Sequence, residues 1–517
     1  MKQINPERTV TALTLLLAAF LGLGLFSQAV HNNSHNEQMY VTAGYLLAQG
    51  EHLYTDFAFV QTPYSPLIYA AVFKLTGGYY LFSAKLVNFA FLAFAAGLLW
   101  LLARRRTRDD LFSAALLALF LANYYLLRAA IEASNYTMPI AFSLAAYALF
   151  LRYIDRPRRP LAFFAAGALL AAAVGAKLYY ATLLAPFALA ALLYPVAASL
   201  RSRIAGGLLP LAGGSVAGAL PLLYYAARDW ERFAFNNLGY HLLNTTWREQ
   251  SGFAPMTWGD LLGVARDILA NPSYLLPVVC LALAAVTLCA QEGCSPRRLR
   301  LPAADITLSA LLVMVSVVTA FTPQPLFPQY FAMPAPFLLT LLIALHAHIA
   351  QPQQRMLQHL TLIAAVLLTL VVLPRHTGAL RGALSPDDRW AGSEARDASF
   401  RIRARIVEGP HDPAAAKLAT VSPVYAIESG LSIYPELSTG SFVLRIGDLL
   451  SAEERARYRA TSPSAIAALF DADPPAAILI TDEGAVELPL LDYAQSRGYV
   501  EVDAEDFGGR LFIKPSP

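Results

Sequence analysis

Long apolar stretches recur along the first 375 positions of the chain, separated by short polar connections. A helix of about 18 or more nearly uncharged residues can cross a hydrocarbon core of roughly 30 Å. A buried helix of a soluble protein would account for one such run, but not for their repetition. The pattern therefore predicts an α-helical polytopic membrane protein with about eleven spans, at 9–30, 83–103, 111–128, 137–153, 161–176, 178–197, 204–226, 273–290, 303–322, 330–349 and 360–374.

Basic residues gather in alternate connections between these spans, namely at Lys2 and Arg8, 104–108, 152–159, 201–203, 297–300 and Arg355. Because Lys and Arg favour the cytoplasmic side, this face is predicted to be cytoplasmic. The N-terminus is then inside and, with an odd number of spans, the C-terminus is outside. The first run is longer than the apolar region of a cleaved signal peptide, which favours a retained signal-anchor. The predicted location is the bacterial inner membrane.

Polar and charged residues become frequent after position 375. Strands are expected at 417–423, 476–482 and 510–515, and helices at 451–460 and 486–498; this alternation is typical of a small α/β domain. We therefore expect a membrane domain at 1–374 with external loops 31–82 and 227–272, a linker at 375–400, and a periplasmic α/β domain at 401–517. That domain lacks a Gly-rich phosphate loop, so a structural or acceptor-positioning role is expected.

Composition agrees with this architecture: 56% of residues are hydrophobic, 15% are charged, and the mean hydropathy is +0.47. The net charge of +3 comes from the basic connections and gives no reason to expect a nucleic-acid partner. All three cysteines, Cys280, Cys289 and Cys294, lie in or beside one predicted span. The external part is therefore cysteine-free and has no disulfide framework.

The first external loop carries the densest set of chemically useful side chains. It contains Asn36-Glu37, then Tyr54-Thr55-Asp56, then Gln61-Thr62-Pro63-Tyr64. A helix is predicted over 37–48, ended by Gly50, and the apolar stretch 66–76 is too short to span and suits the membrane interface. A carboxylate here could act as general base on a hydroxyl or hold a divalent cation against a phosphate. Solvated loop acids are the alternative. The second loop, 227–272, is expected to contain an amphipathic helix over 258–269.

Several short segments resemble motifs of one family. They are Asn36-Glu37, the turn from Gly50 to Asp56, the apolar segment from Pro63 to Leu67, and the stretch from Pro328 to Pro336. This arrangement resembles the GT-C-type membrane glycosyltransferases of the protein O-mannosyltransferase and lipid A aminoarabinose transferase superfamily. The resemblance implies a GT-C-like fold and transfer of a sugar from a polyprenyl-phosphate-linked donor to an extracytoplasmic acceptor, with an inverting displacement expected.

The resemblance also suggests roles for individual residues. The family's first acid is replaced by Asn36, so Asp56 or Glu37 is expected to be the catalytic base, with Asp56 favoured. Lys177 is a candidate ligand for the donor phosphate, although a lysine at the end of a span could also simply snorkel. Glu37 and His241 are candidate ligands if a divalent cation is used. The remaining candidates for donor or substrate binding are Tyr54, Gln61, Tyr64, Arg128, Glu132 and Tyr330.

Two other functions stay open. A transporter or flippase would need ionisable residues inside its spans, and the main exceptions to their apolar character are Asp305, His346 and His348. A non-catalytic scaffold with an external domain is the third hypothesis, because Asn36 cannot accept a proton at neutral pH.

The orientation can be tested with reporters fused after Pro517. We expect a reporter that is active only in the periplasm to be active there, since the basic connections place the C-terminus outside. A reporter active only in the cytoplasm should be silent at the same position, and the reverse result would contradict the predicted topology.

Overall fold

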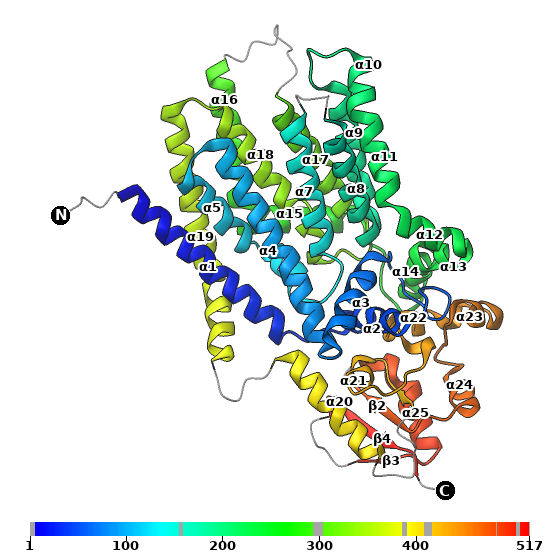
Figure 1. Cartoon of the computed structure of the whole chain (residues 1–517). Helices are drawn as coiled ribbons and strands as arrows, with labels where there is room; N and C mark the ends of the chain where they lie inside the picture. Colours follow the sequence, from blue (N-terminus) through cyan, green and yellow to red (C-terminus); the bar gives the residue numbers. More distant parts are fainter. Residues whose placement is uncertain are drawn as a thin grey trace.

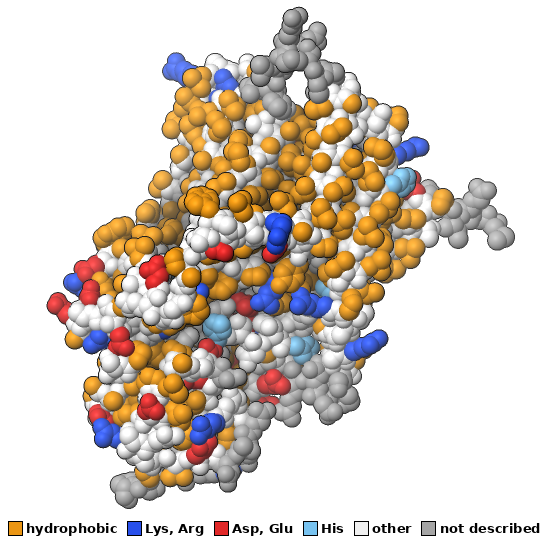
Figure 2. Space-filling view, turned by 180° about the vertical axis from the view of Figure 1, so that it is seen from behind, with side chains coloured by type: hydrophobic (Ala, Val, Ile, Leu, Met, Phe, Trp, Pro, Cys, Tyr) orange, Lys and Arg blue, Asp and Glu red, His pale blue; other side chains and the backbone are white. Residues whose placement is uncertain are grey.

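A bundle of long helices forms the upper part of the molecule and a small α/β unit lies beneath it (Figure 1). The structure, a computed structural model, describes residues 6–154, 159–292, 303–384, 390–407, 416–481, 483–502 and 507–515. Hydrophobic side chains cover much of the upper part, and acidic side chains are more frequent below (Figure 2). This distribution matches an integral membrane protein with a polar unit at one end.

The helices of the bundle coincide with the predicted spans. Five are long and apolar enough to cross a membrane: Pro6–His31 (α1), Tyr80–Thr107 (α4), Pro272–Gln291 (α16), Pro328–His348 (η4 and α18) and Gln351–Ala383 (α19). Two bent pairs also qualify: Asp110–Leu121 with Tyr124–Ala130 (α5, α6), and Leu200–Gly218 with Leu220–Arg228 (α10 to α12). Four shorter apolar helices are Thr137–Tyr153 (α7), Pro160–Ala176 (α8), Leu178–Leu193 (η1, α9) and Ala304–Ala320 (α17). The number of eleven spans stays a prediction, because those four are shorter than a full crossing.

The bend between α5 and α6 has a local cause. Asn123 caps α6, since its side chain accepts hydrogen bonds from the backbone N–H groups of Tyr125 and Leu126. Such a cap starts a new helix in a new direction, here at an angle of 59°. The segment that follows α6 thus turns back at the end of the bundle that faces the α/β unit, and residues 131–136 form a loop there.

The segment 31–82, predicted to be the first external loop, has largely the predicted secondary structure. Helix α2 (His35–Gln49) is capped by Ser34 and ends at Gly50, whose φ of 101° is a left-handed conformation that glycine adopts without strain. The apolar stretch forms α3 (Tyr64–Thr76), which packs against α2. Tyr64 begins α3 with its ring against Gly175, where a side chain would collide with it. In the second loop, α13 (Trp230–Ala234), η3 (Phe235–Gly239), α14 (Tyr240–Gln250) and α15 (Trp258–Ala270) follow one another, and α15 matches the helix predicted at 258–269.

The C-terminal unit contains a four-stranded sheet of order β1-β2-β4-β3. Strand β1 (Leu418–Ala419) runs parallel to β2 (Ala477–Ile480), whereas β4 (Arg510–Ile513) is antiparallel to both β2 and β3 (Val500–Glu501). The predicted strands and helices are present, but the strands are shorter than expected. The remaining helices of the unit are α21 (Val424–Ile427), η5 (Pro435–Leu437), α22 (Ser441–Leu444), η6 (Gly447–Leu449), α23 (Ala452–Tyr458), α24 (Ile466–Ala472), η7 (Gly484–Glu487) and α25 (Leu488–Ser496).

The segment expected to be a linker is mostly helical in its described residues. Helix α19 continues to Ala383, and α20 (Ala391–Val407) buries one face. Trp390 stacks on Phe82 of α4 with ring centroids 5.0 Å apart. The Glu428 carboxylate accepts a hydrogen bond of 2.9 Å from the Leu81 N–H and lies 3.6 Å from Arg396 of α20. These contacts hold the C-terminal unit against the first turn of α4, so the bundle and the C-terminal unit pack together.

Candidate active site

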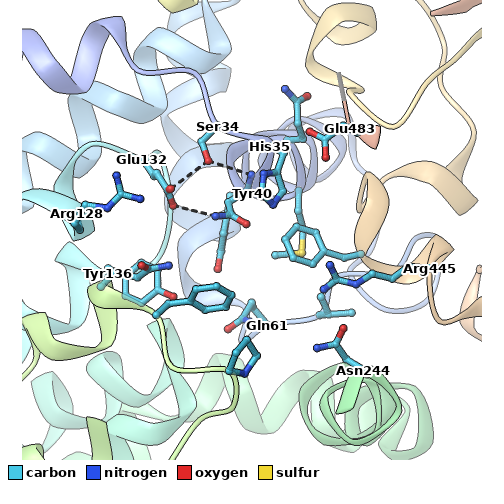
Figure 3. Close-up of a pocket in the computed structure, with 18 of the residues that line it drawn as sticks. Ser34, His35, Tyr40, Gln61, Arg128, Glu132, Tyr136, Asn244, Arg445 and Glu483 are labelled. Carbon is cyan, nitrogen blue, oxygen red and sulfur yellow. Dashed lines mark hydrogen bonds between the residues drawn. The ribbon is translucent and has the colours of Figure 1, made fainter. Parts of the chain in front are cut away.

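A cavity of about 750 Å³ lies where the helical bundle meets the C-terminal unit. The N-terminus of α2, the 131–136 loop, the start of η1 and the η4 segment line it from the bundle, and α14 closes another side. Ser422, Tyr425, Phe442 and Arg445 line it from the C-terminal unit. Figure 3 shows Arg128 and Glu132 on one side of the cavity and Arg445 on the opposite side.

The Glu132 carboxylate lines this cavity and is held in place by two hydrogen bonds. Its two oxygens accept hydrogen bonds from the Ser34 hydroxyl (3.1 Å) and from the Asn36 side-chain amide (3.3 Å). Its residue is 7% exposed, and it lines the cavity. Both donors are neutral, so they orient the carboxylate without adding charge. Glu132 is therefore positioned to accept a proton from a group in the cavity.

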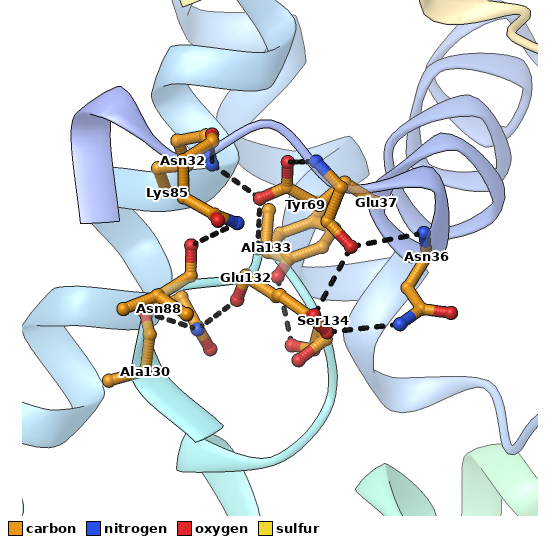
Figure 4. A network of polar contacts seen from close by, with 12 residues as sticks. Asn32, Asn36, Glu37, Tyr69, Lys85, Asn88, Ala130, Glu132, Ala133 and Ser134 are labelled. Carbon is orange, nitrogen blue, oxygen red and sulfur yellow. Dashed lines mark hydrogen bonds and ion pairs between the residues drawn. The ribbon is translucent and has the colours of Figure 1, made fainter. Parts of the chain in front are cut away.

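The loop that carries Glu132 is fixed at three places (Figure 4). The Asn88 side-chain amide of α4 donates to the backbone carbonyl of Glu132, and the Tyr69 hydroxyl of α3 donates to the carbonyl of Ser134 at 3.0 Å. The Glu37 carboxylate of α2 accepts from the Ala133 N–H at 2.7 Å. Three separate helices thus determine where Glu132 lies.

Glu37 itself is fully buried and forms an ion pair with Lys85 of α4. The same carboxylate accepts from the Ser34 N–H, which completes a capping box at the start of α2. Lys85 also donates to the Asn32 carbonyl at 2.7 Å. Burial raises the pKa of the Glu37 carboxyl, whereas Lys85 and the Ala133 N–H stabilise its ionised form. Glu37 does not reach the cavity, so its contacts are those of a positioning residue.

Lys177 lies in the connection between α8 and η1, and its side chain lines the cavity. Its ammonium group donates to the Asn135 side-chain oxygen at 3.0 Å and lies 3.9 Å from the ring centroid of Tyr136. Burial lowers the pKa of Lys177 to about 7, an effect that the nearby Glu132 partly opposes. Within the described part of the chain no carboxylate contacts this cation, which is held by an amide oxygen and an aromatic ring and is therefore suited to an anionic ligand.

Cationic side chains outnumber acidic ones around the cavity. Its lining includes Lys177, Arg128, Arg248 and Arg445, against the two carboxylates Glu132 and Glu483. The Arg445 guanidinium donates to the Tyr240 hydroxyl at 2.8 Å and stacks near the Trp247 and Phe442 rings. An excess of cations in a partly enclosed site attracts anions such as phosphates.

The structure divides the residues expected from the sequence into two groups. Asn36, Gln61, Arg128, Glu132, Lys177, His241 and Tyr330 line the cavity, and Glu37, Asp56, Tyr54 and Tyr64 do not. Asp56 accepts a hydrogen bond of 2.8 Å from the His52 N–H within its own turn. The hydroxyls of Tyr54 and Tyr64 donate to the backbone carbonyls of Gln61 and Gly218. These contacts of Asp56 and the two tyrosines are with the protein itself, and none of the three residues lines the cavity.

The candidate metal ligands are not brought together. Glu37 is paired with Lys85 inside the protein, whereas His241 lines the cavity. In the described parts of the chain, no group of three or more His, Cys, Asp or Glu side chains is arranged to hold a metal ion. Glu37 and His241 therefore do not form one metal site, and the requirement for a divalent cation stays a prediction.

No protein-family model matches the sequence, and no curated protein matches it. The structure of ArnT from Cupriavidus metallidurans bound to undecaprenyl phosphate superposes with a TM-score of 0.61 and 14% identity, covering 98% of both chains. Its apo form gives 0.61 with 13% identity over 97% of both chains. The apo oligosaccharyltransferase of Archaeoglobus fulgidus gives 0.50 with 11% identity, over 92% of this chain and 69% of that chain.

The chain has the GT-C fold. The agreement covers nearly the whole chain, so the GT-C similarity includes the C-terminal unit as well as the helical bundle. The predicted fold class, a helical GT-C-like bundle with a small C-terminal α/β unit, is confirmed. At this level of identity the agreement concerns the fold.

The structure also adds residues that sequence analysis did not single out. Lys85 lies in the predicted span 83–103 but was not named among the ionisable residues inside the spans. Ser34, Tyr136 and Arg445 were not assigned to the site. One signal was present in the sequence: Ser34 followed three positions later by Glu37 is the pattern of a capping box. That pattern ties Glu37 to a helix start rather than to chemistry.

The buried ion pair makes a stability prediction. We expect Lys85→Met to lower the free energy of unfolding by about 3–5 kcal/mol, because Glu37 would be left as an unpaired buried charge. Thermal unfolding of the purified protein in detergent would measure the loss. The double variant Lys85→Met with Glu37→Gln should recover part of it, and a single variant as stable as the wild type would contradict this account.

Proposed function

We propose that this protein is a membrane glycosyltransferase that moves a sugar from a polyprenyl-phosphate-linked donor to a hydroxyl of an extracytoplasmic acceptor. The observation that carries the proposal is the cavity in which Glu132, held by Ser34 and Asn36, faces a positively charged lining that includes Lys177 and Arg128. The GT-C fold supports it, and one structure with that fold holds undecaprenyl phosphate. We further propose that the cavity lies on the external side, as the basic connections predict.

Glu132 is proposed as the general base in place of Asp56 or Glu37. The acceptor hydroxyl oxygen forms a bond to the anomeric carbon of the donor sugar, and its proton passes to Glu132. The bond between the anomeric carbon and the phosphate oxygen breaks, and the polyprenyl phosphate leaves with the electron pair. A single displacement of this kind inverts the configuration at the anomeric carbon.

Lys177 and Arg128 are proposed to stabilise the phosphate as it gains charge. Both line the cavity, and the Arg128 Nε atom is buried with no hydrogen-bond partner among the described residues. Fixed cations aimed at a developing negative charge lower the barrier without reorganisation during the reaction. Tyr330, whose ring centroid is 6.2 Å from that of Tyr136, and Gln61 complete this side of the cavity.

A transporter or scaffold is less well supported by these contacts. Two of the three ionisable groups that sequence analysis named inside the spans are engaged with each other, since His348 lies 3.2 Å from Asp305, and Arg106 pairs with the same carboxylate. The third, His346, lies 3.9 Å from Asp109. A proton acceptor and several cations instead converge on the cavity. This arrangement favours chemistry at the end of the bundle over passage through it.

Replacing Glu132 tests the assignment of the base. We expect Glu132→Gln to lower the rate of sugar transfer by about 10²–10⁴-fold, because an amide cannot accept the proton. The assay is transfer from a polyprenyl-phosphate-linked sugar by purified protein in nanodiscs. Asp56→Asn distinguishes the two assignments: it should retain transfer if Glu132 is the base, and abolish it if Asp56 is. Near wild-type rates in Glu132→Gln would remove that residue from the chemistry.

Lys177 gives donor binding a pH dependence. Only the protonated ammonium attracts the phosphate, so with a pKa of about 7 in the free protein binding should be strongest below pH 7. It should weaken as the pH rises through that value, by about tenfold between pH 6 and 8. The donor is a phosphodiester, whose own charge stays constant over this range. Equilibrium binding of the donor at several pH values would measure the effect.

Lys177→Arg is the matched variant for this measurement. Its guanidinium stays protonated at every pH tested, so the profile should become flat. A wild-type profile that is already flat, or one that Lys177→Arg leaves unchanged, would contradict the role of Lys177.

A further inference from the structure

A second cavity lies at the opposite end of the bundle from the candidate active site. Helix α4 begins at Tyr80, beside Glu428 of the C-terminal unit, and its 28 residues carry it about 42 Å to the basic turn 104–106. Between that end of α4 and helices α7, α17 and α18 there is a groove of about 560 Å³. It shares no lining residue with the cavity that contains Glu132.

The groove has one apolar part and one basic part. Leu98, Leu101 and Ile343 form part of its apolar wall, and Leu101 is 44% exposed on the surface that faces lipid in a membrane protein. Arg105 and Arg152 lie at its basic end, in the last turns of α4 and α7. A groove with an apolar wall that is exposed at Leu101 and with arginines at one end suits an amphiphile.

The charges at the basic end are not equivalent. Arg106 pairs with Asp305, and the neighbouring Arg104, which does not line the groove, pairs with Asp110 at 2.7 Å. Arg105 and Arg152 form no ion pair within the described residues. The His348 Nε2 atom lies 3.2 Å from Asp305 Oδ1, so each oxygen of the Asp305 carboxylate has a partner. Among the described lining residues, Arg105 and Arg152 are thus the two arginines without a carboxylate partner.

We propose that this groove binds an anionic phospholipid, with its phosphate headgroup on Arg105 and Arg152 and an acyl chain along the Leu98, Leu101 and Ile343 wall. Guanidinium groups bind phosphate oxygens through paired hydrogen bonds. Basic pockets between helices on the positively charged face of a membrane protein attract acidic headgroups. A zwitterionic lipid carries its own cation, which offsets this attraction, so the groove selects net negative lipids.

The test uses the full-length protein in detergent, titrated with phosphatidylglycerol or with phosphatidylcholine of the same chains, with native mass spectrometry counting bound lipid. We expect phosphatidylglycerol to bind the wild type at least about tenfold more tightly. Arg105→Gln with Arg152→Gln should weaken that binding by about thirtyfold, which corresponds to roughly 1 kcal/mol for each arginine. Arg104→Gln is the matched control, because it removes a neighbouring arginine that is already paired, and it should bind like the wild type.

Two further arms separate a lipid site from a simple anion site. Ala148→Trp places a bulky ring at a partly exposed lining position and should weaken lipid binding while leaving every charge in place. Soluble glycerol phosphate, which has the headgroup charge but no chains, should not compete at the same concentration. The proposal is overturned if the double arginine variant binds phosphatidylglycerol like the wild type, if both lipids bind equally, or if glycerol phosphate binds as tightly as the lipid.

Discussion

The ion pair between Glu37 and Lys85 is the interaction on which the candidate site depends. Placing two charges away from water costs several kcal/mol for each ion, and their attraction offsets this only when further hydrogen bonds are satisfied. Here those bonds come from the Ser34 and Ala133 N–H groups and are completed by the Asn32 carbonyl. The pair thereby joins α2, α4 and the 131–136 loop at one point. Its value lies in fixing that geometry, since a pair of apolar residues would not select these partners.

The neutral side chain at position 36 follows from the same arrangement. Asn36 donates to Glu132, and a second carboxylate at that position would instead repel it across about the same 3.3 Å. One acid with a neutral donor keeps a single negative charge at the edge of a basic cavity. The departure from the acidic pair of the resembled family therefore leaves one carboxylate at this point of the cavity, and it comes from the 131–136 loop rather than from α2.

Hydropathy was sufficient to predict the helical bundle, because repeated apolar runs of about 18 or more residues are typical of membrane-spanning helices. Turn chemistry predicted the end of α2, where Gly50 takes a conformation that favours glycine. The role of Glu37 could not be predicted in the same way. Its position just outside a span fits both a catalytic acid and a buried partner, and the choice depends on Lys85, which is 48 positions away in the sequence. Asp56 likewise satisfies a local turn, a contact that composition and spacing do not reveal.

The cavity wall has one consequence for the protein as a whole. Phe442 and Arg445 come from the C-terminal unit, whereas Glu132 and Lys177 come from the bundle. A molecule that touches both walls binds only when the two units are in contact, so its binding free energy is added to the free energy of their association. By the same linkage, whatever loosens that association lowers affinity without altering any residue that touches the ligand. Ligand occupancy of the cavity and association of the two units are then thermodynamically coupled.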